Sequence, residues 1–510
     1  MDQSNEEYGR CIKCKQISTS LICQACNSNL KEREHGKCIS CKQIKPINKE
    51  VNYCHTCSSI YGEKKYGKCA ECKQINSGKN WCHTCNSNKF QQNFSNWTSG
   101  NDDIDKFIQN NQLSARSHFQ LLEWIPYDRF SEIVYIAKGG FGKIYRAYWK
   151  DGYISHWDAT KHQWRRNNPN TYVALKILDR SQNLTLKFIN EVTSHVKIFE
   201  YKPLNEFVRC YGISQDPSTK DYIMVMPYAK RGSLRNFLND IKLNQKKMRY
   251  INFNLNFKIG ILSDIAAGLR RIHEKGLIHR DLHIGNILSF MRTTCITDMG
   301  LCKPAYYDKL ENTDNTVYGV LPYMAPEVIR EGHYTQASDI YSFGIIMYET
   351  ISKTPPYPDI NHDEYLATEI CKGLRPNFNI KVPQLIVYLI KRCLDANPSN
   401  RPNAKDLSRT INEWNIELNQ YRNKQPELVE SELIKQMLDI NDNSSSTNIS
   451  NLPFTHPGAI YASRPFKFNN LPEPKNSNNY YENCDNITEI IYSGELSKSN
   501  SECLECEIVN

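Results

Sequence analysis

The segment IHRDLHIGN, residues 278–286, restricts the fold of this chain more than any other stretch. It places a carboxylate, Asp281, and a carboxamide, Asn286, five positions apart on a loop that follows a predicted long helix, FNLNFKIGILSDIAAGLRRIHEKG. Asp281 can orient and deprotonate a hydroxyl group, and Asn286 can hold a divalent cation on phosphate groups. The spacing therefore predicts a catalytic loop for phosphate chemistry, with His279 and Arg280 beside the base.

Further motifs of the same chemistry stand in order around this loop. In IAKGGFGKIY, Gly139 and Gly142 let backbone N–H groups approach phosphates without Cβ clashes. The next predicted strand carries VALK, whose Lys176 would clamp the α- and β-phosphates, and Glu191 on a predicted helix would fix that lysine. In TDMG, Asp298 would hold magnesium between the β- and γ-phosphates. We therefore predict a phosphoryl-transfer site with two Mg²⁺ ions and the catalytic residues Lys176, Asp281, Asn286 and Asp298.

Other residues are expected to support this loop or to regulate it. Glu327 in YGVLPYMAPE would form an ion pair with Arg401 in SNRPNA, and Asp339 in SDIYSFG would brace the loop backbone. Arg280 indicates regulation, because a cation beside the base commonly awaits a phosphate group. The candidate phosphorylation sites follow the metal-binding aspartate and are Tyr306, Tyr307, Thr313, Thr316 and Tyr318.

These motifs carry a resemblance to a known family. Residues 128–418, strand-rich at first and then helical, resemble a eukaryotic protein kinase, more narrowly the tyrosine-kinase-like branch. With its repeated Cys pairs, WTSGN and LEWIPY, the whole chain resembles an expanded set of kinases of root-symbiotic fungi. The resemblance implies an α+β bilobal fold, with a small β-rich N-lobe, a larger helical C-lobe and ATP between them, and a protein substrate. It implies ATP contacts at Ala137, Gly139, Gly142, Ile144, Ala174, Lys176, Met226, Ala229 and Leu288.

Four positions depart from the family pattern. Ala137 replaces the first loop glycine, and Met299 replaces the aromatic residue after the metal-binding aspartate. His283 stands where serine/threonine kinases carry a lysine, and Val320 replaces a threonine near Asp281. We favour a serine/threonine acceptor, with a tyrosine or dual-specificity kinase as the alternative. A catalytically silent scaffold is disfavoured because the lysine, the base and both metal ligands are retained.

Three cysteine repeats occupy residues 1–90, at about 8–29, 35–60 and 66–88. Each repeat has two C-x2-C pairs, which favour a tetrahedral structural zinc ion over a redox pair or an iron–sulfur cluster. His55 and His83 lie between ligands, but four thiols per repeat already suffice. We predict three zinc-ribbon-like modules that bind three Zn²⁺ ions through Cys11, Cys14, Cys23, Cys26, Cys38, Cys41, Cys54, Cys57, Cys69, Cys72, Cys82 and Cys85.

The positive charge is weak evidence for nucleic-acid binding. The formal net charge is +9, and residues 1–90 hold 15 Lys and Arg against 8 Asp and Glu. Three zinc ions on twelve thiolates would lower the total by about six charges. We therefore favour protein docking by these modules over nucleic-acid binding, and regard a nucleic-acid-binding zinc protein as the weaker reading.

The remaining segments carry little patterning. Residues 91–127 read as a linker with a short helix capped by Asn101, and residues 150–170 read as a hydrophilic surface loop. Residues 419–510 read as a possible short helix, within 426–440, followed by a disordered Asn/Ser-rich tail. No signal peptide or membrane segment is predicted, and a cytoplasmic or nuclear location suits the many cysteines as thiols. The sequence leaves the oligomeric state open.

Overall fold

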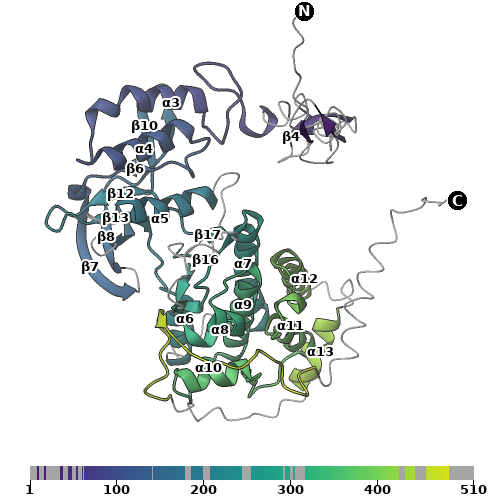
Figure 1. The fold of residues 1–510 in the computed structure, drawn as a ribbon. Helices are drawn as coiled ribbons and strands as arrows, with labels where there is room; N and C mark the ends of the chain where they lie inside the picture. The colour runs from purple at the N-terminus through teal and green to yellow at the C-terminus, as the bar shows by residue number, and fades with distance from the viewer. Residues whose placement is uncertain are drawn as a thin grey trace, which may run out of the picture. The chain divides into compact units, whose positions relative to one another are not determined.

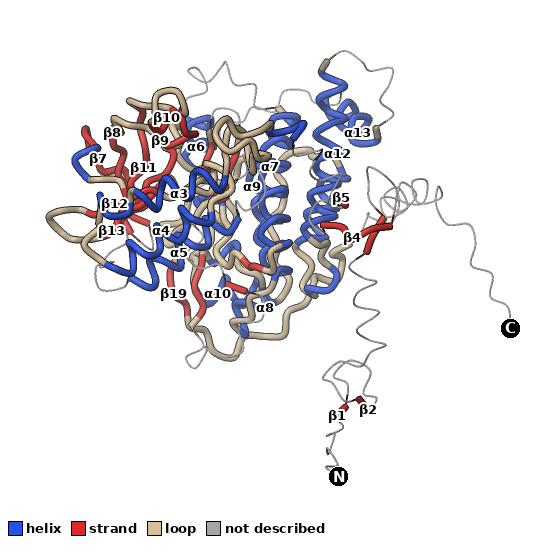
Figure 2. Tube along the Cα trace, turned by 90° about the horizontal axis from the view of Figure 1, so that it is seen from above, coloured by secondary structure: helices blue, strands red, loops and turns tan. Residues whose placement is uncertain are grey.

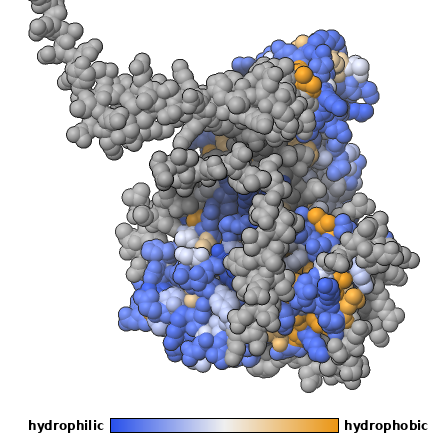
Figure 3. All heavy atoms as spheres, turned by 90° about the vertical axis from the view of Figure 1, so that its right-hand side faces the viewer, coloured by the Kyte–Doolittle hydropathy of each residue, from blue (hydrophilic) through white to orange (hydrophobic). Residues whose placement is uncertain are grey.

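The computed structural model divides into two compact units, Met1–Trp124 with Asp151–Pro169, and Ile125–Lys150 with Asn170–Asn510. In the part of the chain that the structure describes, no helix is long and apolar enough to cross a membrane. On the face drawn in Figure 3, the described residues are mainly hydrophilic, with apolar ones in small groups. The described residues are 63–139, 142–177, 185–198, 207–243, 254–290, 293–298, 303–304, 316–423, 431–442 and 455–481, residue 60, and short strands between residues 9 and 54.

The second unit begins with an antiparallel sheet (Figure 1). Its strands follow the order β12-β13-β11-β8-β7, and alternate residues of β11, Val173 and Leu175, are buried. In the antiparallel β7–β8 pair, Gly139 lies opposite Gly142. Helix α5 follows β11. These elements are β7 (Phe130–Gly139), β8 (Gly142–Trp149), β11 (Thr171–Ile177), α5 (Thr185–Ile198), β12 (Gly212–Gln215) and β13 (Tyr222–Pro227).

The rest of this unit is mainly helical, and its core surrounds α9, most of whose residues are buried. Asn254 caps α7, and Thr335 and Ser338 form a capping box at the start of α9. The predicted β-rich N-lobe and helical C-lobe are therefore both present. The helices are α6 (Leu234–Leu243), α7 (Leu255–Glu274), α8 (Pro326–Glu331), α9 (Gln336–Ser352), α10 (Glu364–Cys371), α11 (Gln384–Cys393), α12 (Ala404–Arg422) and α13 (Glu432–Asp442).

Short strands bracket the catalytic loop. β14 pairs with β17 before the loop and β15 pairs with β16 after it, so both ends of the loop are tied to the helical lobe. These strands are β14 (Leu277–Ile278), β15 (Ile287–Ser289), β16 (Thr294–Ile296) and β17 (Lys303–Pro304).

Part of the C-terminal tail is ordered, which corrects the prediction of a disordered tail for residues 455–481. Strand β19 (Arg464–Phe466) pairs antiparallel with β18 (Val317–Gly319), and the yellow segment in Figure 1 crosses the helical lobe. Figure 2 shows β19 beside α10. Tyr461, Phe466 and Leu471 pack against the core of the helical lobe. A segment too poor in apolar residues to fold alone is thus ordered by a core that other elements supply.

The first unit contains a hairpin where the sequence predicted a surface loop, and this prediction is wrong. Strands β9 and β10 pair antiparallel, and Trp164 stacks on Phe90 with ring centroids 4.4 Å apart and on Trp81 at 6.0 Å. Ile154 joins the same apolar cluster. The aromatic face of the hairpin thus packs on the third cysteine repeat. The elements involved are α3 (His83–Gln92), α4 (Asp102–Ser114), β9 (Tyr153–Asp158) and β10 (Gln163–Asn167).

The linker helix and the first two repeats complete the description of this unit. Helix α4 begins at the expected cap, because the Asn101 side chain accepts the backbone N–H groups of Asp103 and Ile104. Strands β3, β4 and β5 form a small antiparallel sheet, and β1 pairs with β2. These strands are β1 (Gly9–Arg10), β2 (Ile17–Ser18), β3 (His35–Lys37), β4 (Ile44–Asn48), β5 (Tyr53–Cys54) and, before the kinase-like region, β6 (Glu123–Trp124).

Candidate active site and cysteine cluster

Lys176 links the sheet to the predicted metal-binding loop. Its Nζ atom lies 2.5 Å from Glu191 Oε1 on α5 and 2.9 Å from Asp298 Oδ1. Burial alone would lower the pKa of Lys176, but the carboxylates of Asp298 and Glu191 raise it above its usual value. Burial likewise opposes ionisation of Asp298, yet Lys176 holds the pKa of that carboxyl below its usual value. The lysine is therefore a cation with a fixed position.

Asp339 holds the backbone of the catalytic loop. Its carboxylate accepts the N–H of His279 at 2.8 Å and that of Arg280 at 3.0 Å, and His273 Nε2 lies 2.9 Å away. His279 Nε2 also lies 3.1 Å from the Thr297 carbonyl oxygen, just before Asp298. Arg280 has a φ of 73°, a backbone conformation that costs energy for a non-glycine residue. The buried carboxylate offsets this cost, so the loop is held in its bent form.

Asn286 closes the catalytic loop onto Asp281. Its Nδ2 donates to the Asp281 carbonyl oxygen at 2.9 Å and lies 3.2 Å from Asp281 Oδ2. The other carboxylate oxygen of Asp281, Oδ1, is buried and has no hydrogen-bond partner among the described residues. Such an atom is expected to face a ligand or water. Burial favours the neutral acid, but the nearby His283 and the hydroxyl of Ser463 lower the pKa of Asp281, so the base is ionised.

His283 contacts the base directly, a role that the sequence did not reveal. Its Nδ1 accepts the N–H of Gly285 at 3.1 Å, which leaves the ring proton on Nε2, 3.7 Å from Asp281 Oδ2. A Cβ atom at Gly285 would lie 2.6 Å from His283 Cε1, so a side chain there would displace the ring. In the sequence, the available indication of this role of His283 was Gly285, two positions later, which leaves room for the ring.

Ser463 is the second residue of this site that sequence reasoning missed. Its hydroxyl donates to Asp281 Oδ2 at 2.7 Å and lies 3.2 Å from His283 Nε2. Ser463 comes from the ordered tail segment, 182 positions after the base. No periodicity or motif marks it, so a contact of this range can only be read from the fold.

Most of the predicted ATP-binding residues lie on adjacent strands of one sheet, whereas Ala229 follows β13 and Leu288 lies on β15. Ile144 of β8 pairs with Lys176, and Ala174 of β11 pairs with Met226 of β13. Leu288 forms a bridge with Ser233, which follows Ala229 along the chain. Ala137 pairs with Ile144 at the tip of β7. The sheet thus brings Ala137, Ile144, Ala174, Lys176 and Met226 onto neighbouring strands, and the ligand-binding role of the set stays a prediction. Met299 lies outside the described residues.

The predicted supporting and regulatory residues are also placed. Arg401 makes two hydrogen bonds to Glu327, at 2.6 and 2.8 Å, with its side chain fully buried. The Arg280 guanidinium lies 4.4 Å from the Tyr334 ring, and the Tyr334 hydroxyl bonds to the backbone of Tyr318. Phosphorylation near Arg280 stays a prediction. The candidates Thr316 and Tyr318 are described, whereas Tyr306, Tyr307 and Thr313 lie outside the described residues.

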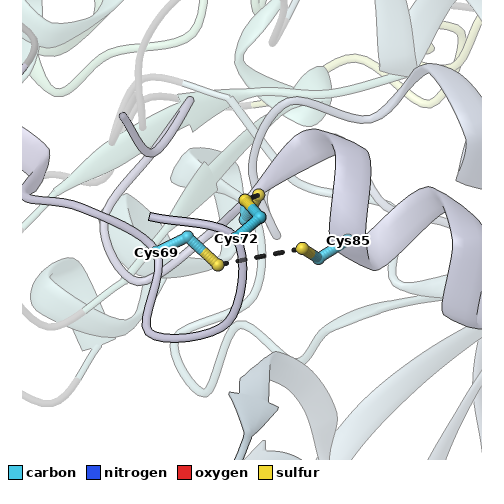
Figure 4. A group of neighbouring side chains, drawn as sticks. Cys69, Cys72 and Cys85 are labelled. Carbon is cyan, nitrogen blue, oxygen red and sulfur yellow. Dashed lines mark hydrogen bonds between the residues drawn. The ribbon is translucent and has the colours of Figure 1, made fainter. Parts of the chain in front are cut away.

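The third cysteine repeat forms a cluster of four thiols (Figure 4). Their sulfur atoms all lie within 4.8 Å of one another, with Cys69–Cys85 at 3.8 Å and Cys72–Cys82 at 3.5 Å. Tetrahedral zinc with Zn–S bonds of about 2.3 Å places its sulfur ligands about 3.8 Å apart. A hydrogen bond from the Gln74 backbone lowers the pKa of Cys72 to about 7, whereas burial raises the pKa of Cys82 and of Cys85. The metal assignment therefore rests on the spacing of the sulfur atoms. The cluster therefore fits a tetrahedral metal ion.

The other cysteines and histidines divide into described and undescribed residues. His83 Nδ1 lies 3.2 Å from the Ala115 carbonyl oxygen and is not a member of the cluster. Cys54 lies in β5, but its side chain is not described. His55 lies outside the described residues. So do seven of the predicted zinc ligands, Cys11, Cys14, Cys23, Cys26, Cys38, Cys41 and Cys57.

Comparison with known proteins agrees with this geometry. A probable LIM domain-containing serine/threonine-protein kinase of Dictyostelium discoideum is 30% identical over 294 residues, 57% of this chain and 40% of that protein. Tyrosine-protein kinase SPK-1 of Girardia tigrina is 28% identical over 293 residues, 56% of this chain and 53% of its own. Dual specificity protein kinase splA of Dictyostelium discoideum is 25% identical over 315 residues, 58% of this chain and 12% of its own.

This chain spans about half or less of the length of the curated relatives it matches. The sequence pattern that defines one family, described as protein tyrosine and serine/threonine kinase, matches residues 131–411. That range is more than half of the chain and includes the Lys176–Glu191 ion pair and the whole catalytic loop. On this match, the chain belongs to the protein tyrosine and serine/threonine kinase family.

Proposed function

We propose that this chain is an ATP-dependent protein kinase that transfers the γ-phosphate to a serine or threonine hydroxyl of a protein. The observation that carries the proposal is one arrangement of charges: the catalytic loop holds the carboxylate of Asp281 against Asn286, and a lysine ammonium group is fixed to Asp298. Degenerate kinases commonly lose one of these groups, and this chain keeps them together with Asn286.

The family implies ATP and Mg²⁺, and the residues of the site fit both. The unpartnered Oδ1 of Asp281 marks an incomplete polar site, and Asp298 and Asn286 are the carboxylate and carboxamide ligands that Mg²⁺ prefers. Magnesium held there would neutralise phosphate charge. Lys176 would bind the α- and β-phosphates, while Asp281 would accept the proton of the attacking hydroxyl at Oδ2. We assign the ATP-contacting role to the residues around Ile144, Ala174 and Leu288.

The choice of acceptor rests on the position of Ser463. The hydroxyl of a serine on an extended segment reaches Asp281 Oδ2 at 2.7 Å. A tyrosine hydroxyl lies several ångström farther from its own Cα, so a tyrosine at the same backbone position would not place its hydroxyl at this oxygen. His283, with a proton on Nε2, supplies a donor beside the acceptor oxygen. These contacts support serine or threonine. Tyrosine or dual specificity remains the alternative, because a relative named a tyrosine-protein kinase matches 56% of this chain and one named a dual specificity protein kinase matches 58%.

The remaining assignments concern the chain outside the active site. We propose three structural zinc ions in modules at residues 1–90, a linker at 91–127, the kinase domain at 128–418 and an extension at 419–510. The geometry of the third thiol cluster supports the zinc assignment. We further propose that the modules dock a protein, that the kinase belongs to the tyrosine-kinase-like branch with its fungal relatives, and that it acts in the cytoplasm.

A peptide-array phosphorylation assay tests the proposal. The full chain with Mg-ATP should label serine and threonine peptides, and Asp281→Asn should abolish the labelling. Labelling that persists in Asp281→Asn would come from a contaminating kinase. Calorimetry gives an independent measure, since nucleotide affinity should depend on magnesium. A correctly folded protein that transfers no phosphate and binds no Mg-nucleotide would refute the proposal.

A further inference from the structure

The ordered tail segment, residues 455–481, is attached to the helical lobe ahead of Ser463. The Tyr461 hydroxyl donates to the Pro356 carbonyl oxygen at 2.9 Å, and the Arg235 guanidinium lies 4.6 Å from the Tyr461 ring. His362 Nδ1 lies 2.9 Å from the Ile460 carbonyl oxygen. An aromatic anchor and a backbone contact thus fix the segment just before it reaches the catalytic loop.

After Ser463 the segment adds a strand to the activation segment. Arg464 pairs with Gly319 and Phe466 with Val317 in the antiparallel β18–β19 pair. The Tyr318 hydroxyl donates to the Ser463 carbonyl oxygen at 3.2 Å. Pairing of an extended segment with a free strand edge is a common way for proteins to bind peptides, because backbone hydrogen bonds give affinity without a fixed sequence. The tail is therefore held as a peptide would be.

Between these two anchors the Ser463 hydroxyl meets the base. Ser463 Oγ donates to Asp281 Oδ2 at 2.7 Å. The protonated Nε2 of His283 lies 3.2 Å from Ser463 Oγ, which can accept that proton. A general base must lie within hydrogen-bond reach of the proton that it removes. The Ser463 hydroxyl satisfies this condition and keeps a lone pair for attack on phosphorus.

We propose that Ser463 is a phosphoacceptor for the active site of its own chain, an inference that rests on the proposed kinase activity. The unphosphorylated segment blocks that site to other substrates. In the transfer step, Ser463 Oγ forms a bond to the γ-phosphorus of ATP. The bond from that phosphorus to the bridging β–γ oxygen breaks, and ADP leaves with the electron pair. The hydroxyl proton passes to Asp281 Oδ2 and then to solvent.

Phosphorylation would open the site. A phosphoserine carries about −1.5 to −2 charges at neutral pH and has no hydroxyl proton to donate to Asp281. Two anions in contact repel each other, so residues 463–466 should leave the base and the strand edge. The distal part should stay attached, because Asn476 Oδ1 accepts the Ala396 N–H at 2.8 Å and the Tyr480 hydroxyl donates to the Lys391 carbonyl oxygen at 2.7 Å. The segment then remains tethered without filling the site.

The test follows phosphate on Ser463 and on an added serine peptide in the same reaction. Phosphatase-treated full chain receives Mg-ATP over a wide range of protein concentration, and mass spectrometry measures both products. We expect Ser463 to be labelled at a rate per molecule that is independent of protein concentration. Peptide labelling should begin after a lag that matches the appearance of phosphate on Ser463.

Variants separate blocking from catalysis. Ser463→Asp should label the peptide without a lag and about tenfold faster than Ser463→Ala, in which the segment stays docked. Ser477→Ala, in the same ordered segment but away from the catalytic loop, should behave like the parent chain. Equal initial rates for the two Ser463 variants would overturn the blocking role.

Other outcomes identify which claim fails. Peptide labelling without phosphate on Ser463 would overturn this inference and leave the kinase proposal standing. A labelling rate of Ser463 per molecule that rises with protein concentration would overturn transfer within one chain, and so would labelling of Ser463 in Asp281→Asn on addition of the parent chain. If neither the peptide nor Ser463 is labelled, the proposed kinase function itself fails, and the inference fails with it.

Discussion

The catalytic loop and the third cysteine repeat both gather groups that carry negative charge, but different partners hold them. Asp298 is paired with Lys176, and the Asp281 carboxylate accepts Asn286 and the Ser463 hydroxyl. The four thiols of the cysteine cluster instead lie against one another. The catalytic carboxylates are thus arranged by the protein's own donors, whereas thiolates so close together need a cation between them. We expect metal removal to disrupt the second site and to leave the first intact.

Removal of zinc should have the largest effect. Binding of structural zinc contributes on the order of 10 kcal/mol to the folding of small modules, so a chelator should unfold the third repeat. Hydrogen exchange should then rise in residues 67–90 and in the hairpin that packs on them. In Cys82→Ser the chain should lose one bound zinc ion by elemental analysis. Cys503→Ser is the control and should lose none, because Cys503 lies outside the three cysteine repeats. If hydrogen exchange in these residues is unchanged after chelation, the cysteine cluster does not need a cation and does not differ from the catalytic loop in this respect.

Substitution of the base should affect chemistry and spare the fold. Asp281→Asn should lower turnover by about 10²–10⁴-fold, the usual contribution of a general base, with little change in melting temperature. Asp339→Asn is the matched variant, because its carboxylate holds backbone rather than substrate. It should destabilise the kinase unit by about 2–4 kcal/mol in denaturant unfolding. Equal stability losses in the two variants would show that Asp281 is also structural.

These expectations rest on a site that could largely be predicted from sequence. The lysine, the proposed base and the two proposed metal ligands stand in short motifs, since phosphoryl transfer needs these groups at fixed spacings along strand and loop. The cysteine pairs are predictable too, because a tetrahedral metal site needs its thiol ligands at short, fixed spacings. His283 could be seen only as a missing lysine, because its contact with Asp281 depends on a ring orientation that Gly285 permits.

The hairpin and the tail could not be predicted, for a different physical reason. Each is too polar to fold alone and is ordered by apolar surface that distant residues supply. The hairpin depends on Trp164 meeting Phe90, and the tail on Tyr461 meeting the helical lobe. Two tryptophans within a polar insertion, Trp157 and Trp164, were the available signal. Their partners could not be named without the fold.

Loss of one aromatic ring should have a smaller effect than loss of zinc. Trp164→Ala removes the stack on Phe90 and the contact with Trp81, and should destabilise the first unit by about 2 kcal/mol. Trp97→Ala is the control, since Trp97 lies in the same unit outside that aromatic cluster. Thermal unfolding followed by tryptophan fluorescence measures both. A larger loss in the control would contradict the packing role of the hairpin.

The smallest expected effect is a shift in pH dependence. The pKa of Asp281 lies below its usual value, so the base stays ionised above the unfolded carboxyl pKa of about 3.9 and loses its charge only as pH falls through the lower folded value. Profiles of kcat/KM should therefore show no acid limb from Asp281 between about pH 5 and 8. His283→Gln removes a source of this lowering, so the limb should move to higher pH. A limb that does not move would exclude His283 as that source.

The hairpin between β8 and β11 also bears on how this protein can be divided or exchanged. A recombinant fragment that begins near residue 128 would retain Trp164 and Ile154 but lose Trp81 and Phe90, the surface against which they are buried. Such a fragment is expected to aggregate, and restoring residues 63–127 should make it tractable. In gene shuffling between relatives, the insertion and the third cysteine repeat would have to be inherited together.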